Sequence, residues 1–285
     1  MAFRFAYSSN AYTRRSLEAA VDAIADLGFD GLEVLADVPH ALVTDAVGWP
    51  AQRVRVLGER IRARGLAISN VNVNTSRGLD PAGDPHGPGI TLVDPDPERR
   101  DRQKAYLHAA VDFCTALGAR TLSLTTGPCF PGQDSEAALA LFRPALLELM
   151  EHGRAQGVRI GIEYEPGFLV GDLPTLLAAL QGTPAEWLGA NWDVGHAWVV
   201  EDDLAQCVEA LGPRIFNLHV EDIRGRVHYH LPIGEGEIDF GALRRALERA
   251  RYDGFLTVEL YTCVDAPDEA GRRSLARLRE VFGRA

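Results

Sequence analysis

Four strand-like runs in the second half of the chain each end in a residue that can bind a metal ion or transfer a proton. The four end residues are Glu163, Asp193, His219 and Glu259. Packing alone does not account for this pattern, because carboxylates and imidazoles are costly to bury unless a partner satisfies them. We therefore hypothesise that the four strand ends converge on one divalent metal ion.

One of these runs carries two carboxylates. Glu163 and Glu165 lie on either side of Tyr164, and alternate residues of a strand face the same side of a sheet. Both carboxylates are therefore expected to point the same way, with Tyr164 pointing the opposite way. Two carboxylates that face one point need a cation or a proton between them, which again favours a metal ion.

The segments that must position these residues alternate regularly. Predicted strands cover residues 3–8, 31–35, 66–74, 120–125, 158–165, 188–193, 214–220 and 255–260. Predicted helices cover residues 17–27, 50–64, 97–117, 135–156, 174–180, 202–211, 240–251 and 268–282. This alternation predicts parallel strands that are joined by helical crossovers.

Eight such units predict one α/β domain over residues 1–285, a closed (β/α)8 TIM barrel. The active site of such a barrel lies at the carboxyl ends of the strands, which is where the four end residues are expected. An open doubly wound sheet is the alternative architecture. The first strand is not followed by a GxGxxG motif, so no dinucleotide-binding sheet is indicated.

Residues 75–97 interrupt the alternation of strands and helices. Their middle part, residues 80–89, contains three prolines and three glycines, so no regular element is expected there. A loop of this length in a compact domain is either disordered or functional. We interpret residues 75–97 as a flap over the active-site face of the barrel.

The overall charge limits the class of partner. The chain has a net charge of −11, and an acidic surface repels the phosphates of nucleic acids and of anionic lipids. No run approaches about 20 apolar residues, the length needed to span a membrane, and the first residues lack the apolar segment of a signal peptide. We therefore expect a cytoplasmic protein that binds neither nucleic acid nor membrane.

Lysine and cysteine usage narrows the chemistry further. Lys104 is the only lysine and lies at a charged helix start, which argues against a Schiff-base enzyme, because that chemistry needs a desolvated lysine. The four cysteines are widely spaced and form no CxxC motif. They are predicted to be free thiols in a reducing compartment.

Five motifs, taken together and in this order, resemble the xylose isomerase-like TIM-barrel superfamily of sugar isomerases and epimerases, which includes tagatose and psicose epimerases. The resemblance spans nearly the whole chain. The motifs are GVRIGIE at 157–163, DVGH at 193–196, HVED at 219–222 with Arg226 behind it, GEGEIDF at 234–240, and VE at 258–259. The FDGLE sequence at 29–33 is also typical of this superfamily.

The resemblance implies a role for each matching residue. The implied metal ligands are Glu163, Asp193, His219 and Glu259. His196 and Arg226 would hold substrate oxygens. Glu163 and Glu259 would also exchange a proton with the substrate, one removing it next to a ketone and the other returning it on the opposite face. The metal would polarise the carbonyl and stabilise the enediolate oxygens.

The implied substrate is a small molecule, either a ketose, a keto-sugar or a cyclitol. No Gly-rich phosphate cradle follows the last two strands, which slightly favours an unphosphorylated substrate. Three carboxylates and one imidazole suit Mn²⁺, Mg²⁺ or Co²⁺, and they are compatible with Zn²⁺. Mn²⁺ is the favoured prediction.

Several assignments stay open at this point. Its distance from Gly157 favours Glu163 as the ligand of its strand, but Glu165 precedes a proline and fits another form of the motif. His228 and His230 are not part of the general pattern. They are interpreted as substrate contacts, as an acid or base, or as solvated loop residues. Asn70, Asn72 and Asn74 alternate in the third strand and also hint at the site.

Three other functions compete with an isomerase or epimerase. The first is a metal-dependent dehydratase, a lyase that acts on a keto-cyclitol such as an inosose or dehydroshikimate. The second is a DNA-repair endonuclease of the endonuclease IV type, which the acidic charge disfavours. The third is a barrel that binds a ligand without catalysis. The sequence is compatible with a homo-oligomer and does not fix the oligomeric state.

Overall fold

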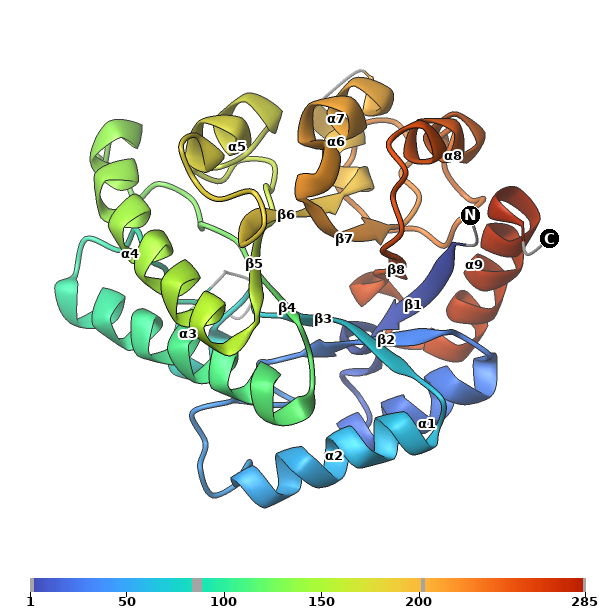
Figure 1. The fold of residues 1–285 in the computed structure, drawn as a ribbon, viewed down its shortest axis with the longest axis horizontal. Coiled ribbons are helices and arrows are strands. Elements are labelled where there is room, and N and C mark those ends of the chain that lie inside the picture. The colour runs from blue at the N-terminus through green and yellow to red at the C-terminus, as the bar shows by residue number, and fades with distance from the viewer. Residues whose placement is uncertain (1–2, 84–88, 201–202, 284–285) are drawn as a thin grey trace.

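The computed structural model describes residues 3–83, 89–200 and 203–283, and its eight strands close into one parallel barrel in chain order (Figure 1). The strands are β1 Arg4–Ser8, β2 Gly31–Leu35, β3 Ala67–Asn72, β4 Thr121–Leu124, β5 Arg159–Ile162, β6 Leu188–Asp193, β7 Ile215–Val220 and β8 Phe255–Val258. The barrel closes where β1 pairs in parallel with β8. The predicted single-domain (β/α)8 TIM barrel is confirmed.

Helices surround the barrel and follow each strand except where short 3-10 turns or loops intervene (Figure 1). They are α1 Leu17–Leu27, α2 Ala51–Ala63, α3 Pro97–Leu117, α4 Ser135–Gln156, α5 Leu173–Leu180, α6 Val194–Val200, α7 Leu204–Leu211, α8 Phe240–Arg249 and α9 Pro267–Phe282. The ends follow ordinary capping rules. The Ser16 hydroxyl accepts from the Ala19 N–H at the start of α1, and Gly28 ends this helix with a positive φ of 86°.

Helix α6 corrects one expectation. The sequence predicted that β6 gives way to a loop, but α6 begins at Val194, directly after Asp193. The Asp193 Oδ1 accepts from the His196 N–H at 2.7 Å, so the last strand residue satisfies a free amide of the first helical turn. The predicted helix 202–211 corresponds to α7, and residues 201–202 lie outside the described ranges.

Several strands end earlier than predicted. Strand β5 ends at Ile162 and β8 ends at Val258, so Glu163 and Glu259 each lie one residue past a strand. The predicted strand 66–74 likewise ends at Asn72 as β3. Backbone pairing nevertheless reaches one residue further, because the Glu163 N–H donates to the Leu124 carbonyl at 2.9 Å and the Glu259 N–H donates to the Val220 carbonyl at 3.2 Å.

The interior of the barrel is polar. Six inward residues from six strands are fully buried: Glu33, Asn70, Ser123, Asn191, Asn217 and Thr257. Hydrogen bonds connect them: Thr257 Oγ1 lies 2.9 Å from Asn217 Oδ1, and Asn217 Nδ2 donates to Asn191 Oδ1 at 2.7 Å. Buried polar groups need such partners, and the resulting network fixes the side chains beneath the carboxyl ends of the strands.

The segment predicted to be a flap is partly described. Ser76 pairs with Gly89 in an isolated bridge, and the side chains of Leu92 and Val93 are buried in the core. Residues 84–88 lie outside the described ranges. The interpretation of residues 75–97 as a flap stays a prediction.

Two further sequence expectations concern thiols and membranes. All four cysteines are free thiols in the structure, as predicted. Among the described residues, no helix is both long enough and apolar enough to cross a membrane.

Close packing at β6 gives a testable prediction for stability. A Cβ on residue 189 would lie against the carbonyl oxygen of Arg214 and 2.8 Å from the ring of Phe216. Gly189→Ala should therefore lower the free energy of unfolding by about 1–3 kcal/mol, the usual cost of overpacking. Urea denaturation of Gly241→Ala is the matched control and should show little change, because a Cβ at this half-buried position of α8 would meet only side-chain atoms, the nearest at 3.2 Å. Equal effects in the two variants would contradict the packing argument.

Candidate active site and metal centre

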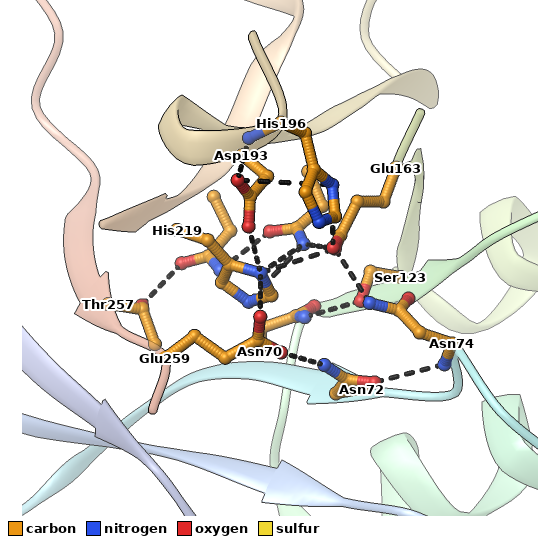
Figure 2. Close-up of polar contacts among 12 residues, drawn as sticks. Asn70, Asn72, Asn74, Ser123, Glu163, Asp193, His196, His219, Thr257 and Glu259 are labelled. Atoms are coloured by element: carbon orange, nitrogen blue, oxygen red, sulfur yellow. Dashed lines mark hydrogen bonds and ion pairs between the residues drawn. The ribbon is translucent and has the colours of Figure 1, made fainter. Parts of the chain in front are cut away.

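The structure brings the four predicted ligand residues together at the carboxyl ends of β5 to β8 (Figure 2). One ligand atom from each residue lies within 4.8 Å of the other three, and all four side chains are buried. The residues are Glu163, Asp193, His219 and Glu259, which we call the carboxylate–histidine cluster. Their convergence is what the hypothesis of a shared cation requires, and their role as ligands stays a proposal.

His219 presents one ring nitrogen to the three carboxylates. Its Nε2 lies 2.7 Å from Glu33 Oε2, and a carboxylate only accepts, so Nε2 carries the hydrogen. Its Nδ1 lies 3.3 Å from Glu163, 3.7 Å from Asp193 and 3.6 Å from Glu259. When a cation occupies the cluster, a neutral His219 would direct its Nδ1 lone pair at that cation, an arrangement that is common in metal-binding histidines.

The charges of the cluster call for a cation. Burial lowers the pKa of His219, but the surrounding carboxylates outweigh burial and hold this pKa well above its ordinary value. Burial also raises the pKa of Glu259 well above its ordinary value, and the neighbouring carboxylate of Glu163 adds to this shift while His219 opposes it. No described residue donates a hydrogen bond to the buried Asp193 Oδ2. The donor set thus fits a divalent cation, which would neutralise the carboxylates and give Asp193 Oδ2 a partner.

Each glutamate of the cluster is anchored by two asparagine side chains that donate to the same carboxylate oxygen. The donors are Asn74 and Asn191 for Glu163 Oε2, and Asn10 and Asn72 for Glu259 Oε1. The other oxygen of each glutamate receives no asparagine hydrogen bond among the described residues. Each carboxylate is therefore fixed through one oxygen and keeps the second for a ligand or a proton.

The two cluster glutamates line a pocket of about 410 Å³, whereas Asp193 and His219 do not. Glu165, His196 and His228, which the sequence placed at the site, also line it. Further lining residues are Asn10, Thr13, Leu35, Val38, Pro39, Asn72, Asn74, Thr75, Arg77 and Tyr261. Thr75 and Arg77 belong to the segment predicted to be a flap, so part of that segment forms a wall of the pocket.

The structure separates the roles that Glu163 and Glu165 are able to take. Both side chains reach the pocket, as the alternation of residues predicts, and Tyr164 is buried with its hydroxyl accepting from Trp192 Nε1 at 3.2 Å. Only Glu163 belongs to the carboxylate–histidine cluster. Burial raises the pKa of Glu165 to about 7. The geometry therefore favours Glu163 as the ligand of this strand.

Three further predicted residues lie in different surroundings. His196 Nδ1 donates to the Tyr164 carbonyl at 2.9 Å, and its Nε2 lies 2.9 Å from His228 Nε2 at the pocket wall. His230 is fully buried and donates from Nδ1 to the Glu259 carbonyl at 2.9 Å, so it lies behind the wall. Arg226 is exposed, with its guanidinium 5.5 Å from the Trp198 ring centroid, and it does not line the pocket that the described residues form. This contact, together with a hydrogen bond from Arg226 Nη1 to the Trp198 carbonyl, holds Arg226 away from the position that the sequence predicted.

Comparison with known proteins agrees with this geometry. The model of one family, the xylose isomerase-like TIM barrel, matches residues 21–281. The chain belongs to this family.

One relative with a known activity matches almost the whole chain. Fructoselysine 3-epimerase of Shigella flexneri is 22% identical over 276 residues, which are 95% of this chain and 95% of that protein. A shorter match, 31% identical over 126 residues, covers 42% of this chain and 43% of an uncharacterized protein of Methanocaldococcus jannaschii.

Solved structures of other proteins share the fold. D-psicose 3-epimerase, crystallised in the presence of D-fructose, superimposes with a TM-score of 0.78 at 16% identity and covers 99% of this chain and 100% of that chain. The IolI protein with a bound zinc atom superimposes with a TM-score of 0.78 at 14% identity and covers 98% of both chains. At these identities the likeness shows the barrel alone.

The glycine at position 195, in the DVGH motif, leaves room for the side chain of Glu221. Its N–H donates to Glu221 Oε1 at 2.6 Å, and a Cβ at this position would overlap the same oxygen. Glu221 is fully buried next to Asp193, and burial together with that neighbouring carboxylate raises its pKa well above the ordinary value. Sequence reasoning quoted Glu221 within a motif but gave it no role.

The contact between Glu33 and His219 gives a prediction for metal affinity. Glu33→Gln keeps the side-chain shape but removes the charge that holds the Nε2 hydrogen, so the Nδ1 lone pair should become a weaker ligand. We expect Mn²⁺ affinity to fall by about 10–100-fold, the usual effect of losing such a support. Isothermal titration with Mn²⁺ measures this, with Glu18→Gln on the outside of α1 as control. Unchanged affinity in Glu33→Gln would contradict the assigned orientation of His219.

Proposed function

We propose that this protein is a divalent-metal-dependent sugar epimerase or isomerase, which moves a proton on the carbon next to a carbonyl of a ketose, keto-sugar or cyclitol. The observation that carries the proposal is the double placement of Glu163 and Glu259. Both belong to the buried carboxylate–histidine cluster, and both line the pocket. The activities of the similar proteins fructoselysine 3-epimerase and D-psicose 3-epimerase support the same class of reaction.

The metal ion would be held by the carboxylate–histidine cluster. Three carboxylates and one imidazole form an oxygen-rich set, for which we propose Mn²⁺ ahead of Mg²⁺, Co²⁺ or Zn²⁺. A bound divalent cation supplies a Lewis acid that polarises the substrate carbonyl and so acidifies the neighbouring C–H bond. The zinc atom of the IolI structure supports a divalent ion in this fold.

The two glutamates would carry the proton. One removes the proton next to the carbonyl, and the other returns a proton on the opposite face of the substrate, which inverts that carbon. Asparagines anchor Glu163 through Oε2 and Glu259 through Oε1. We therefore assign proton transfer to Oε1 of Glu163 and to Oε2 of Glu259.

The remaining pocket residues would orient the substrate. Glu165, His196 and His228 line the pocket beside Glu163 and offer hydrogen-bonding groups to substrate hydroxyls. His230 would hold the neighbouring imidazole of His196, because their ring centroids lie 5.6 Å apart. Substrate contact by Arg226 would need its loop to leave Trp198.

Proton exchange with solvent tests the proposal. The protein with Mn²⁺ is incubated in D2O with a panel of ketoses and cyclitols, and ¹H NMR follows loss of the signal next to the carbonyl. We expect deuterium to enter one carbon of at least one compound, with a product of equal mass apart from the label. Turnover of a substrate without any exchange in the wild-type protein would count against this mechanism.

Nothing in the structure favours the dehydratase alternative over an epimerase. Loss of a β-hydroxyl would follow from the same proton removal, so the exchange experiment also tests it. Mass spectrometry of the product would show a loss of 18 mass units, about one water molecule, if a dehydratase acted through the same acid–base pair.

A further inference from the structure

A second cavity, of about 370 Å³, lies at the opposite end of the barrel from the candidate site. The first residues of β1, β4, β5, β7 and β8 line it, as do three residues of β3. None of its lining residues is shared with the pocket above the carboxylate–histidine cluster. It is therefore a separate site at the amino ends of the strands, and nothing in the proposed function uses it.

This lower cavity is strongly basic in an acidic protein. Four arginines line it, whereas Asp253 is its one acidic lining residue, in a chain with a net charge of −11. The arginines are Arg4, Arg62, Arg120 and Arg159. None of their guanidinium nitrogens lies within 4.0 Å of a carboxylate oxygen among the described residues. These four arginines thus form no direct ion pair with the described chain, and one acidic residue faces four positive charges.

Neutral contacts hold two of these guanidinium groups in place. Arg4 donates to the Asp253 carbonyl at 3.0 Å and lies 4.1 Å from the centroid of the Phe255 ring. Arg159 lies 4.6 Å from the centroid of the Phe216 ring. Carbonyls and aromatic faces orient a guanidinium without neutralising it. These arginines are therefore held in position and keep their charge for a ligand.

Arg159 also shows the electrostatic cost of this arrangement. Burial lowers its pKa, and the like charge of Arg120 adds to the shift, although Tyr252 and Asp253 act in the opposite direction. A bound anion would offset both effects, because an opposite charge at short range favours the charged form of the arginine.

Hydroxyl groups complete the lining. Ser69 and Thr121 both line the cavity and are buried. Ser69 Oγ lies 3.1 Å from Thr257 Oγ1, so the polar network inside the barrel extends to the cavity. Thr121 Oγ1 lies 3.5 Å from Arg159 Nη2. Hydroxyls beside guanidinium groups are the usual partners of phosphate oxygens.

A second hollow of about 420 Å³ borders the cavity. The two share Arg120, Arg159 and Phe216, and the hollow is lined further by Trp187 and Pro213. This hollow carries two arginines and one acidic residue, Glu186, beside apolar groups. A ligand with a phosphate group in the basic cavity would have room here for the organic part attached to that phosphate.

We propose that the lower cavity binds a phosphate group, either as inorganic phosphate or as a phosphate monoester whose organic part lies in the hollow beside Trp187. Several guanidinium groups around one small cavity match a multiply charged tetrahedral anion better than a single carboxylate, because each guanidinium can bind two oxygens.

Isothermal titration of the full-length protein tests this site with inorganic phosphate in one arm and AMP in the other, at constant ionic strength. Both should bind saturably. The double variant Arg120→Gln/Arg159→Gln should bind each at least about tenfold more weakly, because it loses charged hydrogen bonds. Arg55→Gln, an exposed arginine of α2 that donates to Gln52, is the matched control and should bind as the wild type does.

The two arms also separate the two sources of phosphate. Tighter binding of AMP than of phosphate, lost in Trp187→Ala, assigns the site to a monoester, whereas equal binding assigns it to inorganic phosphate. Circular dichroism melting of each variant establishes that it is folded.

Three results would overturn the proposal. The first is the absence of saturable binding to the folded wild-type protein, and the second is an unchanged affinity in the double variant. The third is salt-sensitive self-association that the double variant abolishes without any phosphate binding, which would make the arginines a contact for the acidic surface of a second copy.

Discussion

Glu163→Gln is expected to lower kcat/KM by about 10²–10⁴-fold, the range that general acid–base groups contribute. Glutamine has almost the same shape and can still accept from Asn74, so the pocket should keep its form. Its amide nitrogen then replaces Oε1 and cannot take up a proton, and the amide is a weaker metal ligand than a carboxylate. Steady-state kinetics on the substrate found by the exchange screen measures the effect.

Glu165→Gln is the matched comparison for this variant. Glu165 comes two residues later and lines the same pocket, but it lies outside the carboxylate–histidine cluster. Loss of one substrate hydrogen bond should cost about 0.5–1.5 kcal/mol, or at most about tenfold in kcat/KM. If Glu165→Gln were the more damaging change of the two, Glu163 would lose its assigned place as ligand and base.

Removal of the metal ion is expected to abolish turnover. Dialysis against EDTA should reduce activity to background, because the cluster then has no Lewis acid to polarise the substrate carbonyl. Adding Mn²⁺ after removal of the chelator should restore activity. The melting temperature should also rise with Mn²⁺ concentration, because an ion that binds only the folded chain stabilises it.

Two controls distinguish inactivation by metal loss from inactivation by the chelator itself: a variant of the carboxylate–histidine cluster, and EDTA already saturated with Mn²⁺. His219→Gln should lack activity with or without Mn²⁺ and should show no Mn²⁺-dependent rise in melting temperature. Wild-type protein that is treated with Mn²⁺-saturated EDTA should remain fully active. Full activity in protein shown by elemental analysis to hold far less than one metal ion per chain would contradict the account.

The barrel was predictable because its signals are local and repeated. Capping residues such as Ser16 and stop signals such as Gly28 mark helix ends directly in the sequence, and eight strand–helix units leave few architectures. Helix α6 was missed for the opposite reason. It is only seven residues long, follows β6 without a loop, and is capped by Asp193, a residue that the sequence assigned to the strand end.

The site was predictable only where strand ends carry its residues. Glu163, Asp193, His219 and Glu259 each close an apolar run, and parallel strands bring such ends together. Asn10 lies in a 3-10 turn after β1, 249 residues from the Glu259 that it contacts, and no local pattern links the two.

Loop residues were the least predictable part of the site. Arg226 follows β7 in a loop whose course depends on tertiary contacts, here the contacts of Arg226 with the ring and carbonyl of Trp198. Arg77 enters the pocket from a segment without regular periodicity, so the sequence indicated a flap there but not which side chain faces the pocket. Both positions depend on packing between segments that lie far apart in the chain.

The most direct test of a shared cation is a crystal structure of the protein grown with Mn²⁺, with anomalous diffraction data collected to locate the metal. The account predicts one anomalous peak within about 2.0–2.3 Å of an oxygen or nitrogen of Glu163, Asp193, His219 and Glu259, the range of first-row metal–ligand bonds. A fully occupied Mn²⁺ elsewhere, with no peak among these four side chains, would contradict it.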